Sequence, residues 1–173
     1  MSASDKLINA LNQQVGNEMQ ASLQYISLAH YFETETLLTL SRFFHKQAVE
    51  EHAHAMKFVK FLADLGAELR IPAIPAIPHG FQSAEDAVAQ AFQWEQKVTG
   101  QIHDLMHLAM EEKHLVARQF LEWFIDEQQE EENVMSSLLT VIRRAGPDRL
   151  LDVEAFLVRE NWVAEGTPLA GPG

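Results

Sequence analysis

The sequence predicts an all-α protein: a four-helix up-down-down-up bundle with one long crossover and a short fifth helix at its C-terminal end. Three observations lead to this fold. Proline is absent from 6–65 and from 84–145, and each stretch holds one glycine, Gly16 or Gly100, so both favour long helices. The alternation of apolar and polar residues that is typical of strands is missing, and a proline-rich segment separates the two stretches.

Each helical stretch divides at a polar turn, which yields two helical hairpins. The first turn is expected at 33–36 and the second near Lys113 and His114. The second stretch ends at Gly146 and Pro147, a pair that terminates helices. The expected helices therefore span 5–34, 37–65, 84–112, 116–145 and, for the short fifth helix, 148–160.

The segment between the hairpins is predicted to cross the whole bundle. Residues 71–78 repeat isoleucine, proline and alanine, which favours an extended backbone. About 18 stretched residues reach ~59 Å, whereas a helix of about 28 residues is ~42 Å long. An inter-domain linker is the alternative, but each hairpin alone would leave its apolar faces uncovered. We therefore expect one domain over 1–163 and a flexible C-terminal tail over 164–173.

Composition excludes several classes of function. The 173 residues include 13 basic and 25 acidic ones, and the net charge of −12 repels nucleic acid. Cysteine is absent, which rules out disulfides, thiolate metal sites, iron–sulfur clusters and thiol nucleophiles. With no basic, apolar leader at the N-terminus and no run of 18 apolar residues, we expect a cytoplasmic protein without a membrane partner.

Polar residues interrupt the apolar stripe near the middle of each long helix when the residues are projected at about 100° each. The interruptions that carry chemistry are Glu18 in the first helix, Glu51 and His54 in the second, Glu95 in the third, and Gln128 and Glu131 in the fourth. A single such acid most simply indicates a helix phased slightly differently. Four acids at one height are different, because helices aligned end to end would project them into the same slab of the interior.

Acids buried in this slab require a cation. An unpaired buried carboxylate costs several kcal/mol, and no lysine or arginine lies on these stripes nearby. Four carboxylates carry about −4, which two divalent ions neutralise, and oxygen with imidazole suits iron(II), manganese(II) or zinc. The spacing of Glu51 and His54 lets Glu51 bridge two ions while His54 binds one. Protonated acids sharing hydrogen bonds are the alternative, and they describe the expected empty site.

Four segments of the sequence resemble bacterial non-haem ferritins, and the resemblance covers nearly the whole chain. They are NEMQASLQY at 17–25, EEHAHAM at 50–56, WEQKV at 94–98 and QFLEWFIDEQQEEE at 119–132. The resemblance implies a ferritin-like fold and an iron-storage ferroxidase. Such a protein oxidises two iron(II) ions with dioxygen or hydrogen peroxide and deposits ferric mineral inside a homo-oligomeric shell of 24 subunits.

The resemblance also implies roles for individual residues. The di-iron set is Glu18 and His54 on a first iron, Glu51 bridging, Glu95 and Glu131 on the second iron, and Gln128 assisting there. A third, accessory iron would be held by Glu50, Glu127, Glu130 and Glu131. Tyr25 would join the electron chemistry as a catalytic residue, whereas Tyr25 and Trp123 taken as bare residues are typical of core packing.

Departures from related patterns bear on haem. Haem-carrying bacterioferritins place a methionine directly after the bridging glutamate and repeat Glu-x-x-His on the fourth helix, but here His52 and the run 128–131 stand at these places. No haem is therefore expected, although His52 or Met56 could bind one. Ala53 and Met56 also replace the acids of the mineral-nucleation patch of animal ferritins. A haem-containing bacterioferritin and a non-assembling di-metal oxidase or peroxidase remain the alternatives.

Two further features concern assembly. The apolar residues of 148–160 spread around most of the helix, so that helix is expected to meet other subunits. Arg118 and Glu122 either border a threefold access route or form an ordinary exposed pair.

Overall fold

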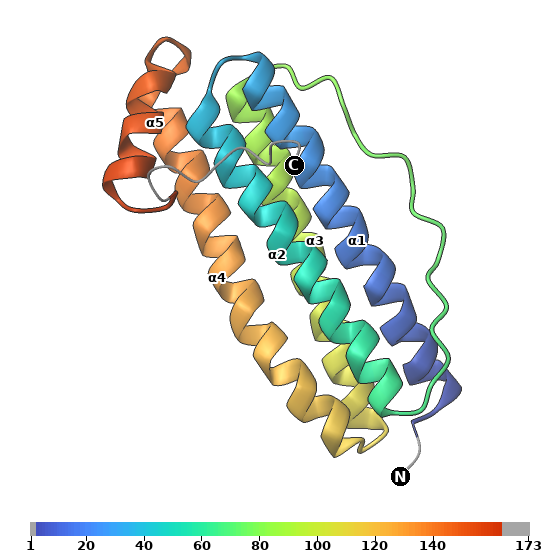
Figure 1. The fold of residues 1–173 in the computed structure, drawn as a ribbon. Coiled ribbons are helices and arrows are strands. Elements are labelled where there is room, and N and C mark those ends of the chain that lie inside the picture. Colours follow the sequence, from blue (N-terminus) through green and yellow to red (C-terminus); the bar gives the residue numbers. More distant parts are fainter. Residues whose placement is uncertain (1–2, 164–173) are drawn as a thin grey trace.

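The computed structural model describes residues 3–163, which form the predicted helical bundle (Figure 1). Its long helices are α1 (Asp5–Thr34), α2 (Leu38–Asp64), α3 (Ala84–Glu111) and α4 (Leu115–Ala145). Each of their ends lies within one residue of the predicted range. The described residues contain no strand. Among these residues, no helix has an apolar run of sufficient length to span a membrane. The tail predicted at 164–173 lies outside the described residues.

The start of the fifth helix differs from the prediction. Gly146 takes a positive φ of 74°, and Pro147–Arg149 forms a 3₁₀ turn before α5 runs over Leu150–Arg159. Proline has a fixed φ and no amide hydrogen, which suits the first residue of such a turn. The regular part of the fifth helix is therefore shorter than the predicted 148–160.

The helices pack as two hairpins that close on each other. α1 lies along α2 and α3 along α4, while α1 also contacts α3. The tight turns that join each pair hold Thr36 and Lys113 at positive φ values of 60° and 54°. α2 and α4 meet through aromatic rings, with Phe61 and Phe120 stacked at a centroid distance of 4.0 Å.

The crossover runs the length of the bundle along α1 (Figure 1), as predicted. The Asn12 side chain fixes its start, donating to the Glu68 carbonyl at 3.1 Å and accepting from the Arg70 amide at 2.6 Å. One turn further on, Pro72 lies so close to Gly16 that a Cβ there would be 2.4 Å from Pro72 Cγ. The glycine in this helix is therefore explained by the close approach of the crossover.

Helix α5 docks across the ends of α2 and α4. It buries Val153 and Leu157, while Leu151 stays 72% exposed. The first turn of α2 has no side-chain cap of its own, and Glu154 Oε1 accepts from the amides of Thr39 at 2.5 Å and Leu40 at 3.1 Å. A carboxylate at a helix N-terminus satisfies free amides and the helix dipole, so α5 stabilises the start of α2.

The apolar core is divided into two parts by a polar layer. One part, toward α5, includes Phe32 and Phe44, and the other, toward the α3–α4 turn, includes Leu11 and Phe58. Along every long helix, the residues of the two parts are separated by the predicted polar interruptions. The four interruptions therefore lie at one level, which is the alignment that the sequence predicts.

Candidate metal centre

The polar layer brings together side chains from all four long helices. Each is at most 6% exposed: Glu18 from α1, Glu51 and His54 from α2, Glu95 from α3, and Gln128 and Glu131 from α4. Because each helix contributes from near its midpoint, the layer is walled by apolar residues above and below. A site built this way is held by rigid elements rather than by loops.

The potential ligand atoms form two groups that share one residue. Atoms of Glu18, Glu51 and His54 lie within 4.8 Å of one another, and so do atoms of Glu51, Glu95 and Glu131. Glu51 thus stands between the two groups, where a carboxylate can bridge two ions. Gln128 supports the second group, because its Nε2 donates to Glu95 Oε2 at 3.1 Å.

Several buried atoms of this layer have no hydrogen-bond partner within the described part of the chain. They are Glu18 Oε2, both carboxylate oxygens of Glu51, His54 Nδ1 and Glu131 Oε2. Buried polar atoms normally have hydrogen-bond partners. Carboxylate oxygens and an imidazole nitrogen that cluster without such partners can instead bind metal ions through their lone pairs. Carboxylates with one imidazole fit iron(II), manganese(II) or zinc, and the residues present therefore fit a pair of such ions.

The electrostatics of the layer indicate crowding of acids without compensation. Burial, followed by the charge of Glu51, raises the pKa of Glu18 well above its usual value. Burial likewise raises the pKa of Glu51 to about 7 and that of Glu95 to about 8. The pKa of Glu131 rises to about 12 through burial and the charges of Glu51 and Glu95. Among the described residues, no lysine or arginine forms an ion pair with these acids.

His54 is suited to bind metal as a neutral imidazole. Burial lowers its pKa, which favours the neutral form of the ring that binds metal. Its Nδ1 lies 3.5 Å from Glu51 Oε2 and 3.6 Å from Glu131 Oε1. The ring packs edge-to-face with Trp123, with the centroids 5.4 Å apart.

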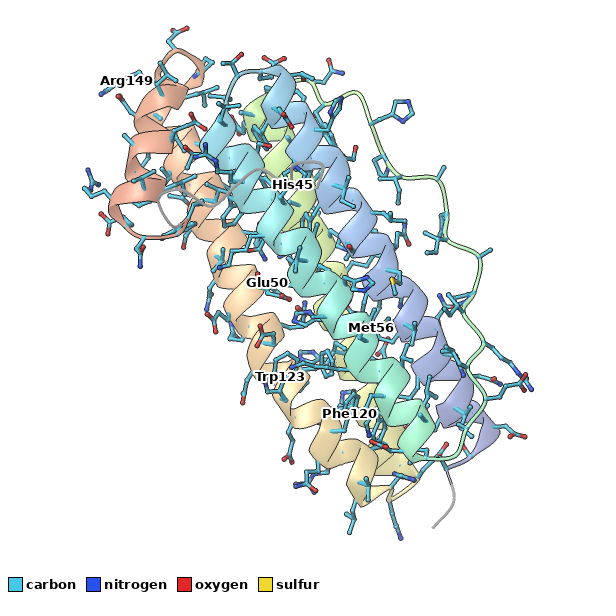
Figure 2. The ribbon with its side chains drawn as sticks, viewed as in Figure 1. His45, Glu50, Met56, Phe120, Trp123 and Arg149 are labelled. Atoms are coloured by element: carbon cyan, nitrogen blue, oxygen red, sulfur yellow. The ribbon has the colours of Figure 1, made fainter. Side chains whose placement is uncertain are left out.

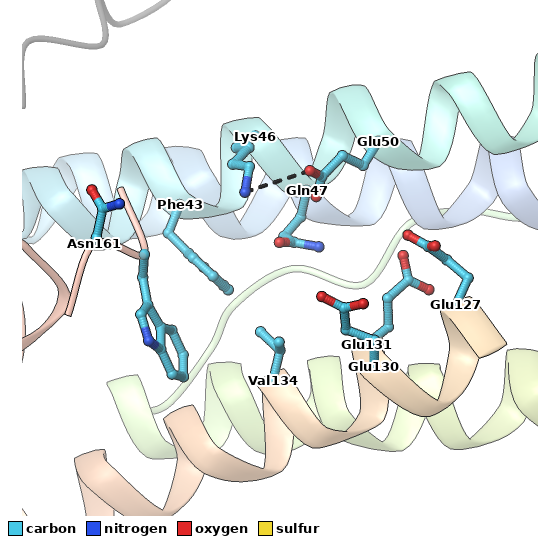
Figure 3. A pocket seen from close by; sticks show the side chains of 10 residues that line it. Phe43, Lys46, Gln47, Glu50, Glu127, Glu130, Glu131, Val134 and Asn161 are labelled. Carbon is cyan, nitrogen blue, oxygen red and sulfur yellow. Dashed lines mark ion pairs between the residues drawn. The ribbon is translucent and has the colours of Figure 1, made fainter. Parts of the chain in front are cut away.

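An acidic cleft of about 240 Å³ opens beside the layer, between α2 and α4 (Figure 3). Its acids are the four predicted for the accessory iron: Glu50, Glu127, Glu130 and Glu131. Glu127 and Glu131 approach His54 closely enough to form a third ligand group. Glu50 and Glu130 line the cleft but belong to none of the three groups, and Glu50 faces Lys46 at 3.5 Å.

The two aromatic residues singled out in the sequence behave differently. Tyr25 is fully buried, and its hydroxyl donates to Glu95 Oε1, so it contacts the second ligand group directly. Trp123 is 39% exposed, so the expectation that it packs in the core is wrong. It lies between α2 and α4 (Figure 2) with Lys57 Nζ 3.1 Å from its ring centroid, an arrangement that a cation over an aromatic face stabilises.

The structure also adds a residue that the sequence analysis missed. Gln14 is 2% exposed on α1, and its Nε2 donates to Glu18 Oε1 at 2.8 Å. An amide four positions before a buried acid on the same helix face is the signal that could have revealed it. Ser22, by contrast, bonds to the Ala48 carbonyl at 2.7 Å and takes no part in the ligand groups.

The residues discussed for haem and for iron access lie at the surface. His52, Ala53 and Met56 are exposed on α2 along a shallow groove shared with Phe120. None of them belongs to the ligand groups of the described residues. Arg118 and Glu122 form an exposed pair on α4 at 3.2 Å.

Comparison with known proteins gives consistent results. Residues 8–145 match the family model described as a ferritin-like domain. Ferritin BfrB of Mycobacterium tuberculosis is 37% identical over 166 residues, which cover 94% of this chain and 91% of that protein. The bacterial non-heme ferritin of Staphylococcus aureus is 32% identical over 145 residues, or 84% and 87% of the two chains. An open-pore ferritin from the archaeon Archaeoglobus fulgidus superposes with a TM-score of 0.87 at 33% identity, covering 90% and 96%.

Proposed function

The chain belongs to the ferritin family, and from this premise we propose that it stores and detoxifies iron by oxidising iron(II) at a di-iron centre within each subunit. The ferric product would be deposited as mineral inside a hollow shell. The observation that carries the proposal is the pair of buried ligand groups that share Glu51 and contain unsatisfied oxygen and nitrogen atoms.

In this proposal iron(II) is the substrate, and each of the two ligand groups binds one iron(II) ion. Glu18 and His54 hold the first ion and Glu95 and Glu131 the second, with Glu51 between them. Gln128 orients Glu95 through its amide. The two ions lose one electron each, and dioxygen takes up these two electrons and two protons to become hydrogen peroxide. With hydrogen peroxide as oxidant, two electrons and two protons yield two water molecules instead.

The protein's acids also supply the proton and charge balance. Because the metal-free layer holds protons on carboxyls whose pKa values are raised, the arrival of two divalent ions displaces those protons. The layer then exchanges protons for metal charge without leaving unpaired carboxylates in the core. Tyr25, bonded to Glu95, is positioned to join the electron chemistry.

The acidic cleft supports an accessory role. Its four acids lead from the second ligand group toward the surface between α2 and α4 (Figure 3). We assign them a third, weaker iron position beside the di-iron centre. No haem is part of this proposal.

Exposed apolar side chains support assembly into a shell. Leu151 on α5 and Leu115 and Val116 at the start of α4 are each at least 59% exposed. Contact with another subunit would remove these side chains from water. We propose a homo-oligomeric shell of 24 subunits in which α5 meets its copies.

The test combines rapid kinetics with particle size. After anaerobic addition of a few equivalents of iron(II), mixing with oxygen should give a fast ferric absorbance, and light scattering should show a very large particle. Glu18→Ala and His54→Ala should abolish the fast phase while the particle forms. A monomer or dimer with fast oxidation would favour a non-assembling di-metal oxidase, and a Soret band after purification would favour a haem protein.

A further inference from the structure

We propose that Gln14 is a positioning residue for Glu18 and that Asn17 sets its orientation. This inference rests on the proposed function, since it concerns the first of the two iron(II) positions. Three side-chain amides on α1 form hydrogen bonds that all run in one direction, toward the carboxylate of Glu18.

The bonds link neighbouring turns of α1. Gln13 Nε2 donates to Asn17 Oδ1 at 3.1 Å, and Asn17 Nδ2 donates to Gln14 Oε1 at 3.0 Å. Gln14 Nε2 then donates to Glu18 Oε1 at 2.8 Å. Residues three and four positions apart share a helix face, so this row, here called the amide relay, needs no other element to form.

The direction of the relay is fixed by its two ends. An amide has one accepting and one donating side, and Glu18 in the ionised form that binds metal only accepts. Because Asn17 donates to the oxygen of Gln14, the amino group of Gln14 must face Glu18. If Gln14 turned over, its oxygen would face the oxygen of Glu18 and its amino group would face that of Asn17.

The two carboxylate oxygens of Glu18 therefore have different roles. Oε1 is occupied by the Gln14 amide, while Oε2 is buried without a hydrogen-bond partner in the described chain. One carboxylate oxygen of Glu18 lies in the ligand group with Glu51 and His54. The relay therefore holds the carboxylate in one rotamer and leaves one oxygen for the metal. Partners of this kind, which orient a ligand without touching the metal, are worth about 10- to 100-fold in metal affinity.

Burial shows where the relay can be altered safely. Gln14 is buried, but Asn17 is half-buried and Gln13 exposed, and all three line a cleft of about 450 Å³ between α1 and α3. A change at Asn17 therefore leaves the core and the ligands intact. Asn17→Asp removes the donor and presents an acceptor, so it should turn Gln14 over, whereas Asn17→Ala only removes the donor.

The experiment titrates the full-length, metal-free protein with cobalt(II), followed by its visible absorption, and measures initial rates of iron(II) oxidation. Gln14→Met and Asn17→Asp should each weaken the tighter cobalt(II) site roughly tenfold or more, and Asn17→Ala should weaken it less. Gln14→Met and Asn17→Asp should also raise the iron(II) concentration that gives the half-maximal rate more than they lower the maximal rate. The double variant Gln14→Met/Asn17→Asp should bind cobalt(II) no more weakly than Gln14→Met alone, because Asn17 acts through Gln14.

Additive effects in the double variant, or wild-type cobalt(II) affinity in Gln14→Met, would overturn the inference. Asn17→Asp, at a half-buried position outside the core, keeps the test decisive if Gln14→Met folds poorly. Wild-type protein that neither binds two cobalt(II) ions nor oxidises iron(II) would instead count against the proposed function.

Discussion

The hydroxyl of Tyr25 on α1 donates a hydrogen bond to Glu95 on α3, 70 positions later in the chain, and so ties the second ligand group to the opposite hairpin. Tyr25→Phe removes this donor and leaves Glu95 Oε1 unsatisfied in the core. We expect a loss of about 1–3 kcal/mol in the free energy of unfolding and a slower fast phase of iron(II) oxidation. Denaturant unfolding and stopped-flow absorbance measure the two effects.

Tyr31 offers a matched control for this substitution. It is the second tyrosine of the chain and packs edge-on against Phe32 and Phe81, far along α1 from the ligand groups. Tyr31→Phe should leave the fast phase unchanged. Equal oxidation rates in Tyr25→Phe and wild type would remove Tyr25 from the chemistry and leave it a purely structural residue.

The raised carboxyl pKa values predict how the stability of the metal-free protein depends on pH. Glu51, with a folded pKa of about 7 against an ordinary value of 4.5, binds its proton more tightly when folded. The stabilisation is complete below pH 4.5 and is lost as the pH rises toward about 7. The neutral amide of Glu51→Gln does not titrate and so does not lose this contribution. Between pH 5 and 8, the free energy of unfolding of the variant should therefore rise relative to that of wild type by on the order of a few kcal/mol.

The control for this pH series is Glu33→Gln, at an exposed position of α1. Its stability relative to wild type should not change over the same pH range. Unfolding curves of chelator-treated protein at several pH values provide the comparison. A difference between Glu51→Gln and wild type that stays flat or shrinks with rising pH would contradict the described crowding of acids.

The acidic cleft predicts a second, separable phase of iron handling. Glu130 lines the cleft but belongs to neither ligand group of the di-iron centre. Glu130→Ala should therefore change the first fast phase by less than about twofold and alter the rate of later turnovers. Repeated additions of iron(II) in stopped flow separate the two. Loss of the first phase in this variant would show that the ligand assignment is wrong.

The contact between Gly16 and Pro72 predicts an asymmetry between two glycines in long helices. A Cβ on Gly16 would meet Pro72 Cγ at 2.4 Å, whereas one on Gly100 meets nothing within 4 Å. Gly16→Ala should lose about 1–3 kcal/mol by displacing the crossover. Gly100→Ala should gain up to about 1 kcal/mol, because alanine favours a helix. Thermal unfolding followed by circular dichroism tests the pair, and equal shifts would refute the contact.

Much of this fold could be predicted because its main determinants are periodic and local. The long helices follow from apolar spacing and from breakers such as Pro147, and the level of the polar layer follows from the midpoint positions of Glu18 and Glu95. The class of metal-ligating atoms could also be predicted, since a chain without cysteine offers oxygen and imidazole ligands. None of these inferences required knowledge of side-chain contacts.

The remainder depended on contacts between distant residues. The cap that Glu154 places on the first turn of α2 joins positions 115 residues apart, and no local pattern signals it. Trp123 has the size of a core residue, but its place at the edge between α2 and α4 leaves it partly exposed. Gln14 was overlooked because a polar residue beside an apolar stripe is ordinary until its partner, Glu18, is known to be buried.

In the proposed function, the buried acids of the polar layer bind two iron(II) ions. Diffraction at the iron edge from crystals soaked anaerobically in ferrous salt tests it most directly. Two anomalous peaks are expected, one among Glu18, Glu51 and His54 and the other among Glu51, Glu95 and Glu131. Crystals that take up iron elsewhere and show no peak between these side chains would contradict it.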